Sequence, residues 1–158
     1  MGVTTYTQEF KTPVAPAKMF KALIVDSHNL IPKVAPQGIK SIDFIEGDGG
    51  VGSIKQTNFA DGGHIKWLKH RIDAIDVEKL VCKYTLIDSD ISFDKIEKVV
   101  YEVKFEAADG GCVCKMTSEY HTKEGVELKE EEIKQGKDKA MGLYKVVEEY
   151  LLANPDAY

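Results

Sequence analysis

Residues 130–153 read EEEIKQGKDKAMGLYKVVEEYLLA, which is the longest helical pattern in the chain. Its apolar side chains recur every three or four residues and therefore share one stripe of a helix: Ile133, Ala140, Leu143, Tyr144, Val147 and Leu151. Glu130 and the two glutamates after it would occupy the first turn, where the helix dipole favours carboxylates. Asn154-Pro155 ends the pattern. A helix of this length needs one large apolar surface to cover its stripe.

Most of the preceding chain alternates with a period of two and predicts about seven strands. The expected strands are Val3–Lys11, Ile39–Glu46, Ser53–Phe59, His64–Ile75, Leu80–Ile87, Ile96–Ala107 and Cys112–Thr122. From the second strand onward the connections are short, which indicates antiparallel neighbours. Separate blocks of strand and helix predict an α+β fold, in which a curved antiparallel sheet grips the C-terminal helix and leaves a space beside it.

Two short helices are expected between the first and second strands. Pro16 suits the first turn of one helix, whose apolar face would carry Met19, Phe20, Leu23 and Ile24. Ser27 is expected to cap the second helix, which Pro32 and Pro36 would confine.

Composition limits the classes of function. A length of 158 residues predicts one domain spanning 1–158. The content of apolar residues (43%) and of charged residues (30%) is ordinary for a globular chain. The net charge of −5 argues against a stable nucleic-acid partner held through phosphates. No apolar run is long enough to cross a membrane, and the first residues do not form a secretory signal. Three cysteines suit a reduced, cytoplasmic protein without disulfides, which we expect to be a monomer.

One stretch contains a literal G-x-G-x-x-G pattern, and it consists of Glu46, Gly47, Asp48, Gly49, Gly50, Val51 and Gly52. A dinucleotide fingerprint must open a helix, whereas a strand pattern follows here, so the pattern does not indicate nucleotide binding. A glycine-rich hairpin turn is the better interpretation. Its backbone amides could still attract an anion weakly.

Seven short motifs together resemble the plant pathogenesis-related class 10 proteins, the family of the major birch pollen allergen. They are Met1-Gly2-Val3, Asn29-Leu30-Ile31-Pro32-Lys33, the glycine-rich stretch, Asp94-Lys95-Ile96-Glu97-Lys98, Asp109-Gly110-Gly111, Tyr120-His121-Thr122-Lys123 and Tyr150-Leu151-Leu152-Ala153-Asn154-Pro155. The resemblance covers essentially the whole chain. It implies a seven-stranded antiparallel sheet around the C-terminal helix, two short helices in a V, and an internal cavity. The implied ligands are small and amphipathic, such as cytokinins, brassinosteroids, flavonoids, melatonin or fatty acids, and the implied role is in plant defence.

Alternation predicts which side chains face this space, with His70, Tyr84, Tyr101 and Tyr120 as the polar anchors. The remaining candidates for the lining are Phe20, Leu23, Leu30, Phe59, Ile65, Trp67, Cys82, Val99, Val103, Cys114, Met116, Ser118, Gly136, Lys139, Ala140 and Leu143. Alternation alone favours an ordinary packed core. The resemblance favours a ligand-binding role for the same residues.

The two thiols of Cys112-x-Cys114 would share a strand face, but no second pair stands at the spacing of a zinc site. We therefore expect small core residues here, and neither a metal nor a cofactor.

Ribonuclease activity is the main alternative function. The resemblance implies a lysine after the glycine-rich turn and acidic and tyrosine residues on the last helix, which correspond to Lys55, Glu148 and Tyr150, with Glu97 as a further carboxylate. A glutamate could act as general base and the lysine could neutralise phosphate. Glu148 stands beside Glu149, however, which is the pattern of a solvated helix face, and the acidic balance disfavours RNA.

A regulatory role is the least favoured alternative. Abscisic acid receptors have the implied fold and inhibit a phosphatase when a Ser-Gly-Leu-Pro-Ala-type gate loop closes. This chain carries Asp61-Gly62-Gly63-His64 and Ser89-Asp90 in the neighbouring turns instead of that loop.

Overall fold

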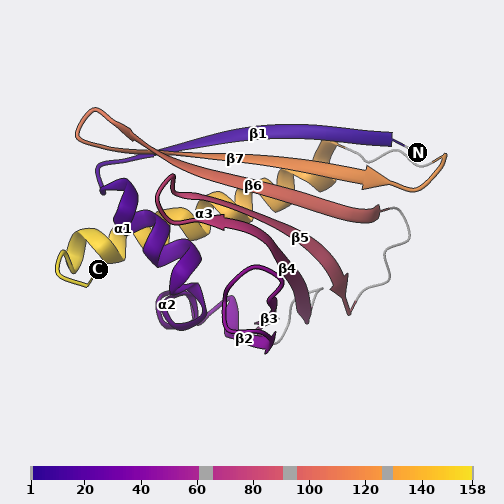
Figure 1. Ribbon diagram of the computed structural model, residues 1–158, viewed down its shortest axis with the longest axis horizontal. Coiled ribbons are helices and arrows are strands. Elements are labelled where there is room, and N and C mark those ends of the chain that lie inside the picture. The colour runs from indigo at the N-terminus through magenta and orange to yellow at the C-terminus, as the bar shows by residue number, and fades with distance from the viewer. Residues whose placement is uncertain (1, 61–65, 91–95, 126–129, 158) are drawn as a thin grey trace.

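The computed structural model describes residues 2–60, 66–90, 96–125 and 130–157, with the side chains of 96, 130–137, 139 and 140 left aside. The strands are β1 (Gly2–Thr12), β2 (Ile39–Glu46), β3 (Ile54–Phe59), β4 (Trp67–Asp76), β5 (Val81–Ser89), β6 (Ile96–Ala108) and β7 (Gly111–Thr122). The helices are α1 (Pro16–Phe20), the π-helical turn η1 (Lys21–Val25), α2 (Ser27–Val34) and α3 (Glu130–Ala153). The predicted α+β fold is confirmed (Figure 1).

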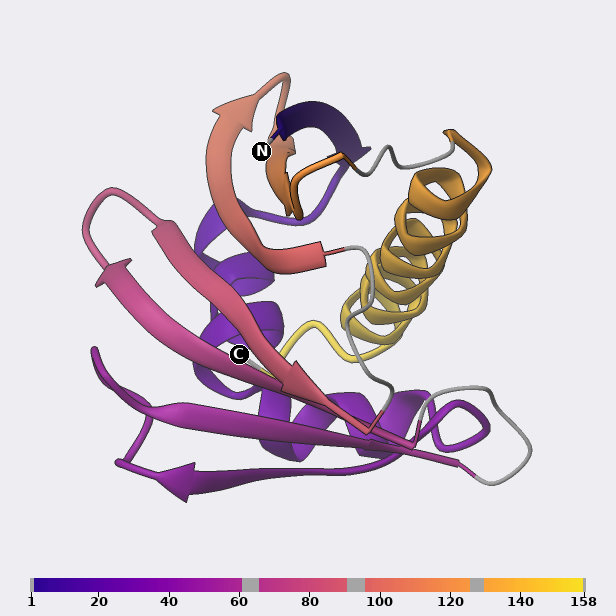
Figure 2. The same ribbon diagram turned by 90° about the vertical axis from the view of Figure 1, so that its right-hand side faces the viewer.

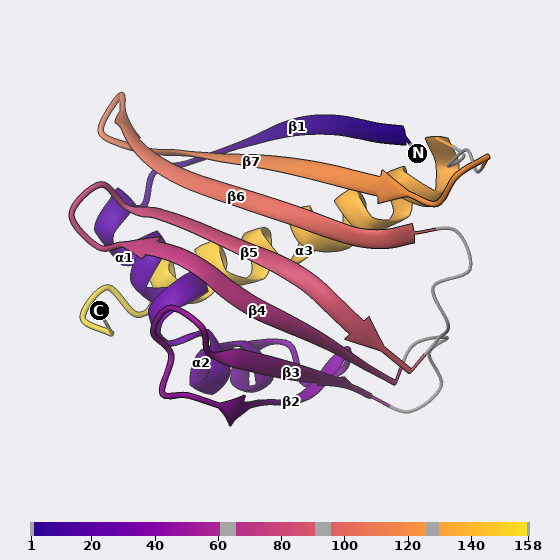
Figure 3. The same ribbon diagram turned by 45° about the vertical axis from the view of Figure 1, so that its right-hand side comes forward.

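The strands form one antiparallel sheet in the order β1-β7-β6-β5-β4-β3-β2, which Figure 3 shows from one edge to the other. β1 pairs with β7 along its whole length, from Gly2 opposite Thr122 to Thr12 opposite Cys112. Register shifts occur in the β2–β3 and β4–β5 pairs, where bulges increase the bend. The sheet therefore curves strongly, with α3 on its concave side (Figure 2).

The second short helix begins differently from the prediction. Asp26 precedes α2 without a side-chain cap, so the expected capping role of Ser27 is wrong. Ser27 is the first residue of α2, and its hydroxyl donates to the Ile24 carbonyl (3.4 Å) and accepts a hydrogen bond from Lys55 Nζ (2.7 Å). Pro32 lies inside α2 rather than ending it. A tertiary contact with β3 has therefore replaced the local cap.

The apolar core consists of two clusters on the concave face. The first cluster joins α1, η1, α2 and the C-terminal half of α3 to the sheet, and its buried members are Val14, Met19, Phe20, Ala22, Leu23, Leu30, Cys82, Val103, Phe105, Cys112, Cys114, Met116, Tyr144, Val147 and Leu151. Edge-to-face ring pairs reinforce it, with centroids 5.9 Å apart for Phe10–Tyr144 and 5.6 Å apart for Phe20–Phe105. The second cluster is smaller and consists of Leu86, Val99 and Tyr120, with Tyr6, Leu68 and Tyr101 packed against it.

In the described helices, no segment is both long and apolar enough to cross a membrane.

Two adjacent leucines on α3 provide a test of this packing. Leu151 is 3% exposed and Leu152 is 53% exposed. We expect Leu151→Ala to lower the free energy of unfolding by roughly 2–4 kcal/mol, because it removes buried methyl groups and leaves a cavity. Leu152→Ala, the matched control, should cost less than about 1 kcal/mol. Urea unfolding measures both values, and equal losses would contradict the proposed orientation of α3.

Candidate functional site

Three rings meet on the concave face of neighbouring strands: His70 on β4, Tyr84 on β5 and Tyr101 on β6. Tyr84 lies opposite Tyr101 in the sheet register, and their rings stack with centroids 5.1 Å apart. The His70 imidazole meets both rings edge-on, at 5.4 Å from Tyr84 and 5.9 Å from Tyr101. We call these three residues the ring cluster.

Burial controls the protonation of the ring cluster. Burial, with a smaller contribution from the positive charge of Lys55, lowers the pKa of His70 to about 4. Burial also raises the pKa of Tyr84 and of Tyr101 well above the usual value. At neutral pH the cluster is therefore uncharged and presents one imidazole and two hydroxyl groups.

The three rings nevertheless keep part of their surface accessible, unlike Val103 and Cys114 further along the same face. Tyr84 packs against the first apolar cluster and Tyr101 against the second, so the ring cluster lies where the two meet. Groups that are desolvated and yet incompletely covered are expected to face an enclosed space. Apolar walls with a few converging polar groups are typical of small-molecule sites.

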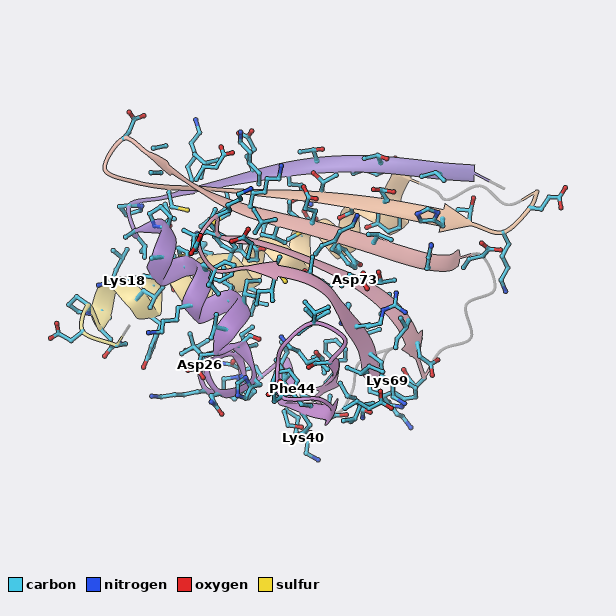
Figure 4. The ribbon with its side chains drawn as sticks, in the orientation of Figure 1. Lys18, Asp26, Lys40, Phe44, Lys69 and Asp73 are labelled. Carbon is cyan, nitrogen blue, oxygen red and sulfur yellow. The ribbon has the colours of Figure 1, made fainter. Side chains whose placement is uncertain are left out.

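Lys55 on β3 lies beside the ring cluster, directly opposite His70 in the β3–β4 register. Its Nζ donates to Ser27 Oγ (2.7 Å) and lies 5.8 Å from the centre of the Phe44 ring. Phe44 lies on β2 (Figure 4) and also contacts His28 of α2, with ring centroids 4.8 Å apart. Burial lowers the pKa of Lys55, and only a negative charge on Cys82 would oppose this shift.

Sequence reasoning missed Ser27, His28 and Phe44 as neighbours of Lys55. Alternation along β2 puts Phe44 on the same face as Ile42, and the hairpin register puts Phe44 opposite Lys55. The sequence pattern therefore suffices to predict that Phe44 is a neighbour of Lys55. No pattern in the sequence indicates that α2 brings Ser27 to this strand.

The predicted lining residues fall into several groups. Seven of them pack in the first cluster: Phe20, Leu23, Leu30, Cys82, Val103, Cys114 and Met116. Val99 and Tyr120 belong to the second cluster, and Ser118 is buried on β7, opposite Tyr101 of β6. Phe59 shares the face of Lys55, and Leu143 is half-buried on α3. A ligand-binding role for these residues stays a prediction. Ile65 lies outside the described residues, as do the side chains of Gly136, Lys139 and Ala140.

Trp67 was placed wrongly. It lies three residues before His70, and the pairing of β4 with β3 is unbroken from Trp67 to Arg71, so the two side chains point to opposite faces. Lys69 Nζ sits 4.8 Å from the Trp67 ring on the convex face, whereas Leu68 packs in the second cluster. Trp67 therefore does not line the concave side.

The glycine-rich stretch forms the hairpin turn between β2 and β3, as predicted. Gly47, Gly49 and Gly52 all have positive φ, and a side chain at Gly47 would also collide with Ser53. Gly49 N–H donates to Ser53 Oγ (3.0 Å), Gly50 N–H to Asp48 Oδ1 (3.3 Å) and Gly52 N–H to the Ile72 carbonyl (2.8 Å). These amides already have partners, so the turn offers little to a free anion.

The two thiols of Cys112 and Cys114 are buried on the same face of β7, with Sγ atoms 3.8 Å apart. All three cysteines are free. Within the described ranges, no group of three or more His, Cys, Asp or Glu side chains could hold a metal ion.

The four residues predicted for RNA cleavage do not converge. Lys55 is part-buried on the concave side of β3, whereas Tyr150 accepts a hydrogen bond from Lys33 Nζ (3.2 Å) in an exposed contact. Glu97 is exposed near the start of β6, and Figure 1 shows that end of β6 far from the C-terminal end of α3, which carries Glu148 and Tyr150. Catalysis by this set stays a prediction that the geometry does not favour.

Comparison with known proteins gives consistent matches over the whole chain. The family model described as "Pathogenesis-related protein Bet v 1 family" matches residues 1–154. Major allergen Pru ar 1 of Prunus armeniaca is 54% identical over 159 aligned positions, which cover 100% of this chain and 99% of the relative. Pathogenesis-related protein STH-2 of Solanum tuberosum is also 54% identical with the same coverage.

Solved structures give the same fold. The crystal structure of Ara h 8.0201 superposes with a TM-score of 0.88 at 39% identity, covering 97% of this chain and 100% of that one. Norcoclaurine synthase from Thalictrum flavum superposes with a TM-score of 0.78 at 20% identity, covering 96% of this chain and 87% of that one, which shows a shared fold alone.

His70 should make the fold sensitive to acid. Its pKa is 6.5 ordinarily and about 4 in the folded chain, so the unfolded chain takes up the proton first. Burial of the neutral imidazole therefore contributes fully to the free energy of unfolding above pH 6.5. This contribution falls as the pH is lowered, and at pH 4 the loss is at most about 3 kcal/mol. Urea unfolding across this range should show a smaller loss for His70→Gln than for the wild type. Equal losses in the two proteins would contradict the burial of a neutral imidazole.

Proposed function

Because this chain belongs to the Bet v 1 family of pathogenesis-related proteins, we propose that it binds small apolar or amphipathic molecules between its curved sheet and α3. The observation that carries this proposal is the ring cluster, in which His70, Tyr84 and Tyr101 are desolvated but incompletely covered. A ligand that fills the remaining space would complete their packing.

The chemistry of the ring cluster favours flat aromatic ligands. The stacked pair Tyr84–Tyr101 offers ring surface, and its hydroxyl groups together with the His70 imidazole offer hydrogen bonds that fix orientation. Cytokinins, flavonoids and melatonin all combine a flat ring system with a few polar groups. A ligand that buries roughly 300 Å² of apolar surface gains about 7 kcal/mol, which is close to micromolar binding.

The proposed setting is intracellular plant defence. The family name and the pathogenesis-related relative support the defence role, and three free cysteines support a reducing compartment such as the cytoplasm. Ligand binding itself requires neither a cofactor nor a second chain in this proposal.

Titration with the fluorescent apolar probe ANS tests the proposal. We expect saturable binding by the wild-type chain, and displacement by one or more members of a panel of cytokinins, flavonoids and melatonin. Absence of saturable binding would mean that side chains fill the space, and the proposal would then be rejected.

Tyr101→Ala should weaken ANS binding by roughly five- to tenfold, because it removes one ring of the stacked pair. Lys104→Ala is the matched control on the same strand, since Lys104 is exposed on the convex face beside Glu102. The control should bind as the wild type does. Urea unfolding of both variants separates lost affinity from lost folding, and an unchanged affinity of folded Tyr101→Ala would remove the ring cluster from the site.

A further inference from the structure

Lys55 is an unusual lysine for its position. It lies on the concave side of the sheet, where its described neighbours are the Ser27 hydroxyl, the Phe44 ring and the His70 imidazole. Among the described residues no carboxylate forms an ion pair with it, and the ionisable groups coupled to it electrostatically are His70 and Cys82. A buried charge without an opposite charge is costly, so this environment stabilises the neutral amine.

The neutral neighbours determine what this amine can do. Ser27 is 2% exposed and accepts one N–H of Lys55, which holds the side chain in place without supplying charge. Cys82 stays a thiol because burial raises its pKa to about 11, and burial keeps His70 neutral at pH 7. A desolvated lysine amine with a free lone pair is a nucleophile towards carbonyl carbon. Selection for aldehydes would come from the apolar walls around it.

We propose that Lys55 forms a reversible imine with small aromatic aldehydes that enter the space beside the ring cluster. This inference rests on the proposed function, since the aldehyde must first reach the interior. It adds a covalent step that packing and hydrogen bonding of a ligand do not require.

The step balances without any further reactant. The Nζ lone pair attacks the aldehyde carbon, the carbonyl π electrons move to oxygen, and one amine proton passes to that oxygen to give a carbinolamine. Loss of the hydroxyl group with the second amine proton releases water and leaves a C=N bond. The neutral His70 imidazole lies across the β3–β4 pair from Lys55 and can carry protons between nitrogen and oxygen. Hydrolysis reverses the sequence.

Selectivity among the twenty lysines of the chain follows from their environments. An exposed lysine has a pKa near 10.4, so only about one amine in 2,500 is neutral at pH 7. The exposed Lys115 also forms an ion pair with Glu106, which raises the pKa of Lys115 and favours its charged form. Burial lowers the pKa of Lys55, so a larger fraction of its amine is reactive at the same pH.

Reductive trapping tests the inference on the full wild-type chain. Benzaldehyde at low molar excess with cyanoborohydride at pH 7 converts any imine to a stable benzylamine, and peptide mass mapping then locates the label. We expect most of the label on Lys55. Lys55→Met should lose that label, whereas Lys104→Met, the matched surface control, should keep it. The wild-type map does not depend on the folding of either variant.

A charged aldehyde provides the second control. 4-Formylbenzenesulfonate has the same reactive group but a permanent negative charge, so it should label Lys55 at least about tenfold less than benzaldehyde does, because charge is costly to bury. Benzaldehyde label spread over exposed lysines, with little on Lys55, would overturn the inference.

ANS titration of the same wild-type preparation keeps the two proposals distinct. Saturable ANS binding without label on Lys55 rejects the imine and leaves the proposed function standing. Absence of saturable ANS binding rejects the proposed function, and it rejects the imine as well, because the aldehyde then has no space to enter.

Discussion

Tyr144, Val147 and Leu151 on α3 must all be withdrawn from water, and only a surface that bends around the helix can cover the whole stripe. The seven-stranded sheet provides that surface because its strands twist and because bulges in the β2–β3 and β4–β5 pairs increase the bend. Every other feature of the site depends on this geometry. The strands that hold the ring cluster face inward only because the sheet closes around α3.

The bend has different effects at different places along α3. Where α1, η1 and α2 join the C-terminal half of α3, large side chains such as Met19, Phe105 and Val147 interlock and form a dense core. Beyond this region the described concave face carries hydroxyl, imidazole and amine groups that a dense core would not tolerate without partners. These polar groups reduce stability, since each must lose water, and they are what makes the interior chemically useful.

Much of this fold could be predicted from local pattern. The predicted bounds of α3 and β2 agree with the structure, and alternation correctly predicts one buried face that carries Cys112, Cys114, Met116, Ser118 and Tyr120. Prediction from local pattern fails where contacts between distant segments determine the position of a side chain. Trp67 and His70 cannot share a face of one regular strand. Ser27 does not cap α2, and its hydroxyl accepts a hydrogen bond from Lys55, which lies 28 residues away in the sequence. The three residues of the ring cluster are predictable from the sequence. The surroundings of the Lys55 amine are not, because they depend on tertiary contacts.

The pairing of β1 with β7 also affects how the chain is made. Thr12 lies opposite Cys112 and Gly2 opposite Thr122. During synthesis β1 therefore leaves the ribosome first, and it can pair with β7 only after 100 or more further residues have been added. At about 5–20 residues per second, that interval is roughly 5–20 s. Throughout it the backbone edge of β1 is unpaired and open to other chains. Such high contact order predicts slow folding, in which assembly of the sheet and of its concave face finishes only when β7 has been synthesised.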